Sequence, residues 1–143
     1  MLTENVLEFI LGGKAFFTIV SERTQVRYTY RVVARKSSGA AGTIHFVSVL
    51  RGADNEKDYA YMGCILNGQR FVLTEKSQIS QSAPSYIAFA WLFDRLVANK
   101  KLPDGVKFYH CGKCARCGRK LTVPSSLETG FGPECAGKVF WGL

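Results

Sequence analysis

Clustered cysteines constrain this sequence more than any other feature. The cysteines of the chain are Cys64, Cys111, Cys114, Cys117 and Cys135. Two residues separate Cys114 from Cys117, a spacing that lets both thiolates reach one metal ion, and Gly118 permits the positive φ that completes such a turn. Cys135 follows Pro133 in an expected helical turn, where exposed backbone amides stabilise a thiolate. The pattern predicts a zinc knuckle in which Cys114, Cys117 and Cys135 bind Zn²⁺.

The fourth ligand is open between two neighbouring residues. His110 lies four residues before Cys114, so a small loop can return its imidazole to the metal. Cys111 offers a thiolate, the better zinc ligand, and would create a Cys-x2-Cys-x2-Cys run. Because Cys114 can form a knuckle with only one neighbour and the glycine follows Cys117, we favour His110 and keep Cys111 as the alternative.

Two other states of the cysteines are compatible with the sequence. The thiols can be reduced and free of metal, or they can bind an iron–sulfur cluster, which also uses four cysteine ligands. A catalytic zinc is disfavoured, because the His-x-Glu and Pro-Cys-x-x-Cys signatures of the zinc deaminases are absent from the sequence. We therefore expect a structural metal site and no enzyme activity.

Apolar periodicity predicts an α+β fold. Alternating, β-branched and aromatic segments indicate an antiparallel sheet of about five strands. The expected strands are 14–21, 24–36, 43–50, 59–66 and 70–74, with a further short one at 106–109. Thr3 is the expected cap of a short helix over 4–11, and Ser82 that of a long helix that covers the sheet. We expect residues 1–106 to form the sheet and helix domain and 107–143 the zinc-knuckle module packed on it.

The C-terminal stretch resembles a known family. The motifs that carry the resemblance are Cys114-Ala115-Arg116-Cys117-Gly118-Arg119, Leu121-Thr122 and Gly132-Pro133-Glu134-Cys135. They resemble small uncharacterised proteins and domains of bacteriophages and other mobile elements, whose members often carry a histidine just before the knuckle, as His110 does here. The resemblance implies a phage or mobile-element origin and a zinc-binding module, and it implies no biochemical activity.

Charge points to nucleic acid as the first candidate partner. The net charge is +8, and residues 100–143 hold eight basic and three acidic residues, hence +5. Basic residues on a rigid surface attract phosphates, and arginines recur every four positions along the expected second strand. Exposed Tyr or Phe beside them can stack on bases. The candidate nucleic-acid-binding residues are Arg23, Arg27, Arg31, Arg35, Lys107, Lys113, Arg116, Arg119 and Lys120.

The alternative is a protein that binds and inhibits a host protein or an immune nucleoprotein complex, of the anti-defence or anti-CRISPR kind. A positive field would also serve this role, by engaging an acidic partner. The N-terminus carries no signal-peptide pattern, and no apolar run is long enough to span a membrane. We therefore expect a cytoplasmic location in the bacterial host. The sequence does not indicate an oligomeric state.

Overall fold

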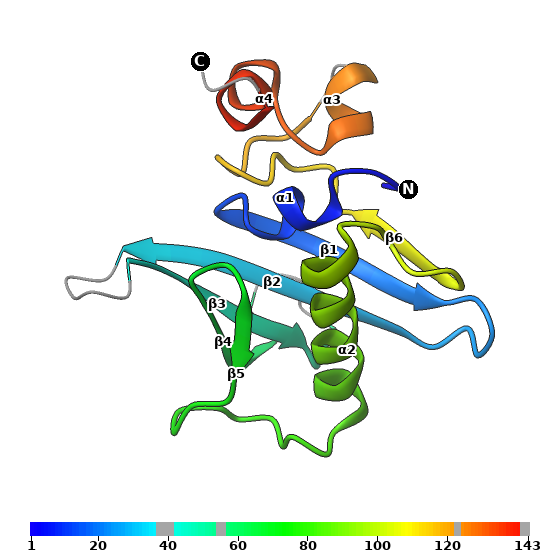
Figure 1. Cartoon of the computed structure of the whole chain (residues 1–143), viewed down its shortest axis with the longest axis vertical. Coiled ribbons are helices and arrows are strands. Elements are labelled where there is room, and N and C mark those ends of the chain that lie inside the picture. Colours follow the sequence, from blue (N-terminus) through cyan, green and yellow to red (C-terminus); the bar gives the residue numbers. More distant parts are fainter. Residues whose placement is uncertain (37–41, 54–56, 122–123, 141–143) are drawn as a thin grey trace.

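A six-stranded antiparallel sheet forms the centre of the molecule (Figure 1). The computed structural model describes residues 1–36, 42–53, 57–121 and 124–140. Along the sheet the strands follow the order β5-β4-β3-β2-β1-β6. They are β1 (Lys14–Ser21), β2 (Arg27–Lys36), β3 (Thr43–Leu50), β4 (Tyr59–Leu66), β5 (Arg70–Val72) and β6 (Val106–His110). The first five are consecutive in the chain, as in a meander, whereas β6 joins the far edge after a long helix.

Helices cover one face of this sheet and one end of the molecule. The long helix α2 (Pro84–Asn99) lies across the sheet, with α1 (Val6–Ile10) beside it, while α3 (Pro124–Thr129) and α4 (Pro133–Phe140) lie beyond α1 (Figure 1). The predicted α+β architecture, with an antiparallel sheet and one long helix, is therefore confirmed, with β6 completing six strands. None of the described helices has both the length and the apolarity that crossing a membrane requires.

The core lies between the sheet and α1 and α2. Side chains of a strand alternate between its two faces, so every second residue of β1, β2 and β3 points into this space. Phe17, Tyr30 and Phe89 meet there, with ring centroids 5.2–6.3 Å apart. All three are completely buried. Aromatic contacts of this kind add to the stabilisation from apolar burial, which makes this layer the main source of the stability of the fold.

The other face of the sheet carries no helix in the described part of the chain. The intervening residues of β1 to β4 point this way, and most of them are half-buried or exposed. Ser48 and Cys64 are buried on this face but lie outside the core cluster. Antiparallel sheets commonly leave one face in contact with solvent. We call this side the open face.

Helix caps and one strand boundary differ from expectation. Asn5 caps α1 in the left-handed region, at φ 57°, and the predicted cap Thr3 lies before it. Ala83 is the N-cap of α2 in an extended conformation; the hydroxyl of Ser82 contacts that of Ser80, 2.9 Å away, instead. Both predicted caps were wrong. Thr3 lies two residues before the observed N-cap Asn5, and Ser82 forms a local hydrogen bond instead of capping α2.

β2 begins later than the predicted Thr24. Gln25 has a φ of 61° and donates its backbone amide to the carbonyl of Ser21. This closes a turn between β1 and β2, so the strand starts at Arg27. Trp91 of α2 is 43% exposed.

Candidate metal centre and the neighbouring basic surface

Three cysteine side chains converge in the C-terminal part of the chain. The sulfur atoms of Cys114, Cys117 and Cys135 all lie within 4.8 Å of one another. Two of them come from the loop after β6, and the third from the first turn of α4 (Figure 1). Three thiolates this close together could hold a metal ion.

A tight hairpin over residues 113–120 brings Cys114 and Cys117 together. The amide of Cys114 donates to the carbonyl of Arg119 at 2.7 Å, and the amide of Gly118 donates to the carbonyl of Cys114 at 2.9 Å. Gly118 has a φ of 81°, which glycine adopts without a steric penalty. The chain therefore reverses within four residues, and both thiols reach the same point.

The third thiol lies at the positive end of a helix. Pro133 begins α4 and Cys135 follows two residues later, where unpaired amides and the helix dipole favour negative charge. Nη1 of Arg116 donates a hydrogen bond to the sulfur of Cys135 at 3.7 Å. A guanidinium beside a thiol also favours its ionised form.

The thiols differ in their ease of ionisation. Burial raises the pKa of Cys114, but hydrogen bonds from the backbone amides of Cys117, Gly132 and Arg116 outweigh this effect and lower the pKa to about 7. Burial raises the pKa of Cys135, and the neighbouring cysteines add to the rise while Arg116 opposes it. Because metals bind thiolates, Cys114 is more ready than Cys135 to begin metal binding near neutral pH.

The cysteine cluster is anchored to the rest of the fold. The amide of Lys14, the first residue of β1, donates to the carbonyl of Ala115 at 2.6 Å, and the amide of Ala115 donates to that of Gly130 at 2.9 Å. Phe131 is completely buried, and its ring centroid lies 6.1 Å from that of Phe9 in α1. The backbone that carries the clustered cysteines is therefore held in place by hydrogen bonds to the start of β1.

His110 makes a different set of contacts. Both nitrogens of its ring lie at backbone groups: the amide of Gly112 donates to Nδ1 at 2.9 Å, and Nε2 lies 2.6 Å from the carbonyl oxygen of Leu127. The histidine holds the loop after β6 against α3 in this arrangement. Among the described residues, the ligand atoms that lie within 4.8 Å of one another are the three cysteine sulfurs, and the ring nitrogens of His110 are not among them. Its role as fourth ligand stays a prediction.

Cys111 points away from His110. His110 pairs with Phe17, whose side chain is in the core, and the next residue in a strand faces the opposite side. The amide of Cys111 donates to the carbonyl of Phe16, which places this thiol at the edge of the open face. Burial raises its pKa, and Lys113 partly offsets the rise. Like His110, Cys111 stays an untested alternative for the fourth position.

The cluster coincides with a family match. Residues 107–140 match the model of a family of unknown function, DUF6011. The match covers all three clustered cysteines and about a quarter of the chain, so it concerns the edge strand β6 and the module that follows it rather than β1 to β5. Among curated proteins and solved structures, none is significantly similar to this chain.

The basic residues named from the sequence fall into separate groups. Arg27, Arg31 and Arg35 lie on the open face, in register with Val20, Phe16 and Ile44 of the neighbouring strands. Lys107 of β6 also pairs with Val20 and faces the same side. The knuckle adds Lys113, whose Nζ lies 5.1 Å from the ring centroid of Phe16. A second group lines a hollow beside the cysteine cluster: Arg116, Arg119 and Lys120.

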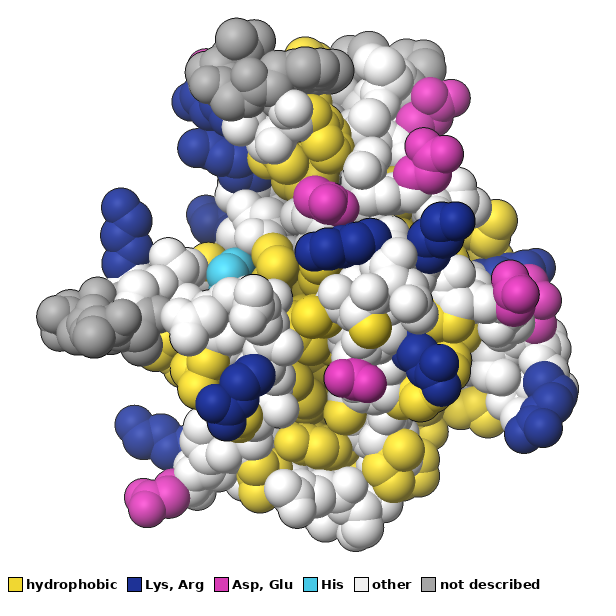
Figure 2. Space-filling view, in the orientation of Figure 1, with side chains coloured by type: hydrophobic (Ala, Val, Ile, Leu, Met, Phe, Trp, Pro, Cys, Tyr) yellow, Lys and Arg dark blue, Asp and Glu magenta, His cyan; other side chains and the backbone are white. Residues whose placement is uncertain are grey.

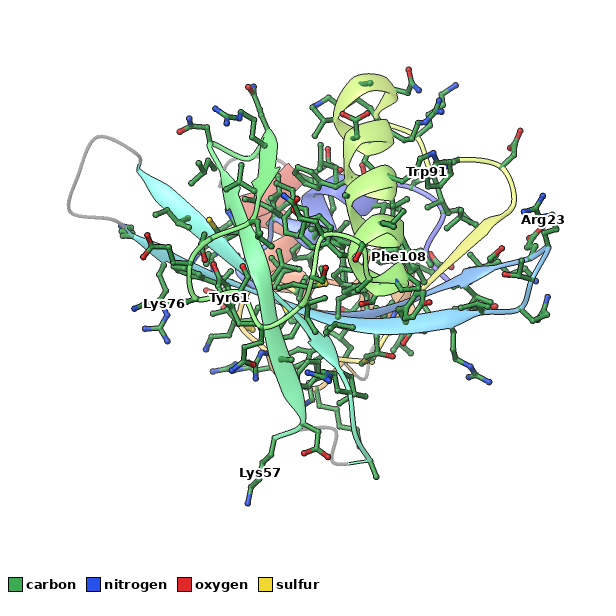
Figure 3. The ribbon with its side chains drawn as sticks, turned by 90° about the horizontal axis from the view of Figure 1, so that it is seen from below. Arg23, Lys57, Tyr61, Lys76, Trp91 and Phe108 are labelled. Carbon is green, nitrogen blue, oxygen red and sulfur yellow. The ribbon has the colours of Figure 1, made fainter. Side chains whose placement is uncertain are left out.

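Arg23 is separate from both groups. It lies in the turn between β1 and β2, where it lines a mostly apolar hollow beside α2 together with Val26 and Trp91. Figure 3 places Arg23 at one end of the sheet, far from Tyr61. Of the arginines in the four-residue repeat, Arg27, Arg31 and Arg35 therefore share the open face, and Arg23 does not.

Sequence reasoning did not identify which aromatic residues accompany the basic ones. Five lie on the open face: Phe16, Phe46, Tyr59 and Tyr61, which are half-buried, and Tyr109 of the edge strand β6, which pairs with Thr18 and is exposed. The alternation in β1 contained the signal, since Phe16 lies between Ala15 and Phe17, which are both buried. The side chains of β4 could not be assigned in this way, because the register between β3 and β4 shifts at Val47 and Ser48.

Proposed function

We propose that this protein is a zinc-binding accessory protein of the phage or mobile-element type, which binds nucleic acid through the basic open face of its sheet. The observation that carries the proposal is the placement of Arg27, Arg31 and Arg35 on one solvent-facing surface, with Lys113 of the knuckle beside them. The role assigned is binding rather than catalysis. The phage-type origin rests on the motif resemblance alone.

Zinc is the metal that best fits the three thiols. Soft thiolate ligands select Zn²⁺, Cu⁺ or iron–sulfur clusters, and a Cys-x2-Cys turn with a more distant cysteine is typical of structural zinc. The hydrogen bonds that lower the pKa of Cys114 to about 7 favour the charged ligand that zinc needs. Bound zinc would fix the 113–120 hairpin and thereby the position of Lys113.

The electrostatics of the open face support a polyanion as the ligand. A hollow in its centre is lined by Lys14, Arg31 and Arg35 together with neutral residues, and within the described ranges of the chain no acidic side chain lines it. Figure 3 shows nitrogen-tipped side chains on the side of the sheet away from α2. Clustered positive charge of this kind binds phosphates through the release of counterions, whatever the base sequence.

Salt-dependent binding tests this proposal. We expect fluorescence anisotropy of a labelled oligonucleotide to show binding at low salt that weakens as salt is added. The double variant Arg31→Gln/Arg35→Gln should weaken binding and reduce the slope of log Kd against log salt concentration by about two, one unit for each lost phosphate contact.

Arg23→Gln/Lys101→Gln is a matched control with the same loss of charge. Both residues are exposed, and they line hollows on the α2 side of the molecule. This variant should keep the wild-type salt slope. Absence of binding to any nucleic acid at low salt, or an equal effect of both double variants, would contradict the proposal.

One observation favours the second candidate, a protein that inhibits a host protein or nucleoprotein complex. Ile87 and Trp91 of α2 are 54% and 43% exposed, and with Val26 they line an apolar hollow. Figure 2, which shows this side, has apolar side chains gathered over α2 with charged ones scattered around them. Exposed apolar patches mark protein contacts. Stoichiometric capture of one host protein after nuclease treatment, lost in Trp91→Glu, would favour this candidate.

A further inference from the structure

We infer that the nucleic acid bound by the open face is single-stranded, and that its bases stack on the half-buried aromatic rings of β1, β3 and β4. This inference rests on the proposed function and specifies its ligand. The rings concerned are those of Phe16, Phe46, Tyr59 and Tyr61, which we call the aromatic platform.

The sheet register places aromatic and basic side chains in one row. Phe16 of β1 lies opposite Arg31 of β2, Arg31 opposite Ser48 of β3, and Ser48 opposite Tyr61 of β4. Residues opposite one another in antiparallel strands point to the same face. The row therefore crosses four strands, with one ring near each end and a guanidinium between them.

Contacts across the sheet show that the open face is concave. The ring centroids of Phe16 and Tyr59 lie 6.1 Å apart, although β2 and β3 separate their strands. Cζ of Arg31 lies 4.7 Å from the ring centroid of Tyr59. Neighbouring strands are about 4.8 Å apart, so rings on β1 and β4 meet here by leaning toward each other across two strands, and we infer that the sheet also curves toward this side.

The platform continues beyond this first row. Phe46 lies one row away, and its ring centroid is 6.0 Å from that of Tyr61. The hydroxyl of Tyr61 accepts a hydrogen bond from Thr74 at 3.2 Å, which fixes this ring at the rim of the face. Fixed rings lose little conformational entropy when a ligand stacks on them, so they form a preorganised surface.

Burial distinguishes these rings from the core aromatics. Phe17, Tyr30 and Phe108, on the other face, are completely buried, whereas the four rings of the platform are only half-buried. Nothing in the described part of the chain packs over the platform as α2 packs over the core. Partly exposed rings that lie next to one another and beside arginines form a contiguous apolar patch, and such patches mark binding sites.

The chemistry of the platform selects single strands over duplexes. In a duplex the bases are stacked on one another and their faces are inaccessible, whereas a single strand can splay its bases onto aromatic rings and guanidinium planes. Reading a duplex groove commonly uses a protruding helix or ribbon. Both α1 and α2 lie on the other face of the sheet, so neither can enter a groove from the open face (Figure 1).

The metal module contributes to the same surface. Nζ of Lys113 lies 5.1 Å from the ring centroid of Phe16, and Lys113 immediately precedes the metal-cluster residue Cys114. A phosphate next to a base stacked near Phe16 would be within reach of this ammonium group. The knuckle thus supplies charge at one end of the platform, and Arg31 and Arg35 supply it in the middle.

Competition between labelled and unlabelled oligonucleotides tests the inference. The probes are 20-nucleotide oligothymidylate, oligouridylate of the same length, and a 20-base-pair duplex. We expect at least one single strand to bind about tenfold more tightly than the duplex. Stacking contributes enough per base that Phe16→Leu and Tyr59→Leu should each weaken single-strand binding about tenfold while leaving duplex binding within about twofold. The DNA and RNA probes then show which sugar is preferred.

Two further variants keep the test independent of folding defects. Arg31→Lys preserves the charge and removes the planar guanidinium, so it should reduce single-strand binding more than duplex binding. Trp91→Leu removes an exposed ring from α2, on the opposite side of the sheet from the platform, and should change neither (Figure 3). Far-ultraviolet circular dichroism and the thermal midpoint confirm that each variant is folded.

The outcomes separate this inference from the proposed function. Equal or tighter binding of the duplex, or single-strand binding indifferent to Phe16→Leu, Tyr59→Leu and Arg31→Lys, would overturn the platform while leaving nucleic-acid binding intact. If no probe binds at low salt, both proposals fail. A stoichiometric protein partner whose binding is abolished by Tyr59→Leu, with no oligonucleotide bound, would reassign the platform to protein recognition.

Discussion

At the scale of single residues, the buried His45 makes the stability of the fold depend on pH. His45 is 8% exposed and lies in β3 on the core face, with Nε2 3.1 Å from the carbonyl oxygen of Leu11. Its Nδ1 has no hydrogen-bond partner among the residues that the structure describes. The neutral ring donates from Nε2 in this geometry. Burial lowers the pKa of His45 below its ordinary value of 6.5, although the bond to Leu11 opposes the shift.

This burial predicts an acid-sensitive stability. The unfolded chain binds a proton at His45 near pH 6.5, whereas the folded chain resists it, so the free energy of unfolding falls as the pH drops below about 6.5. The slope contributed by one group is at most about 1.4 kcal/mol per pH unit. Denaturant unfolding between pH 7.5 and 5 should show a smaller slope in His45→Asn than in the wild type. Equal slopes would contradict the assignment.

At the scale of elements, alternation and turn chemistry made the sheet predictable. β1, β3 and β4 have the boundaries expected from the sequence, because each is a run of apolar, β-branched or aromatic residues that ends at turn residues. The turn from Cys114 to Gly118 was equally predictable, because the Cys-x2-Cys-Gly pattern specifies a local geometry. The caps, by contrast, depend on which local hydrogen bond a polar side chain forms, and the start of β2 depends on the positive φ of Gln25.

The set of side chains that make up the open face was the hardest feature to predict from the sequence. The four-residue repeat of arginines identified one strand of it. The contact between Phe16 and Tyr59, however, links residues 43 positions apart through the curvature of the sheet. Pairing and curvature of distant strands are properties of the assembled fold, so local pattern cannot supply them. The spacing of the sequence likewise made both His110 and Cys111 candidate metal ligands. Only the pairing of β6 with β1 shows that their side chains point to opposite faces of the sheet.

The metal module makes a separate prediction at this scale. Cys114→Ser should lose most of the roughly one equivalent of zinc that the wild type is expected to retain on purification, because serine replaces a thiolate ligand. Cys111→Ser is the matched control, and its thiol lies at the open face rather than in the cluster. Elemental analysis measures both. Zinc retained in Cys114→Ser would exclude the cluster as the site, and zinc lost in Cys111→Ser would make Cys111 a ligand.

On the scale of the whole molecule, the sheet divides two environments. One face packs against α1 and α2 and forms the core, and the other presents cations and aromatic rings in a concave surface. The C-terminal module touches both: Phe131 packs on Phe9 of the core side, and Lys113 extends over Phe16 of the open face. The module therefore connects the core of the fold to the open face. If the proposed function is right, we expect metal removal to weaken nucleic-acid binding.

Mapping the bound surface by nuclear magnetic resonance tests the central claim most directly. Amide spectra of ¹⁵N-labelled protein would be recorded during titration with 20-nucleotide oligothymidylate at low salt. We predict that shift changes concentrate in the centres of β1 to β4 and at Lys113, while amides of the exposed side of α2, around Ile87 and Trp91, stay unchanged. Changes confined to α2 and the β1–β2 turn, or no changes at all, would contradict a nucleic-acid site on the open face.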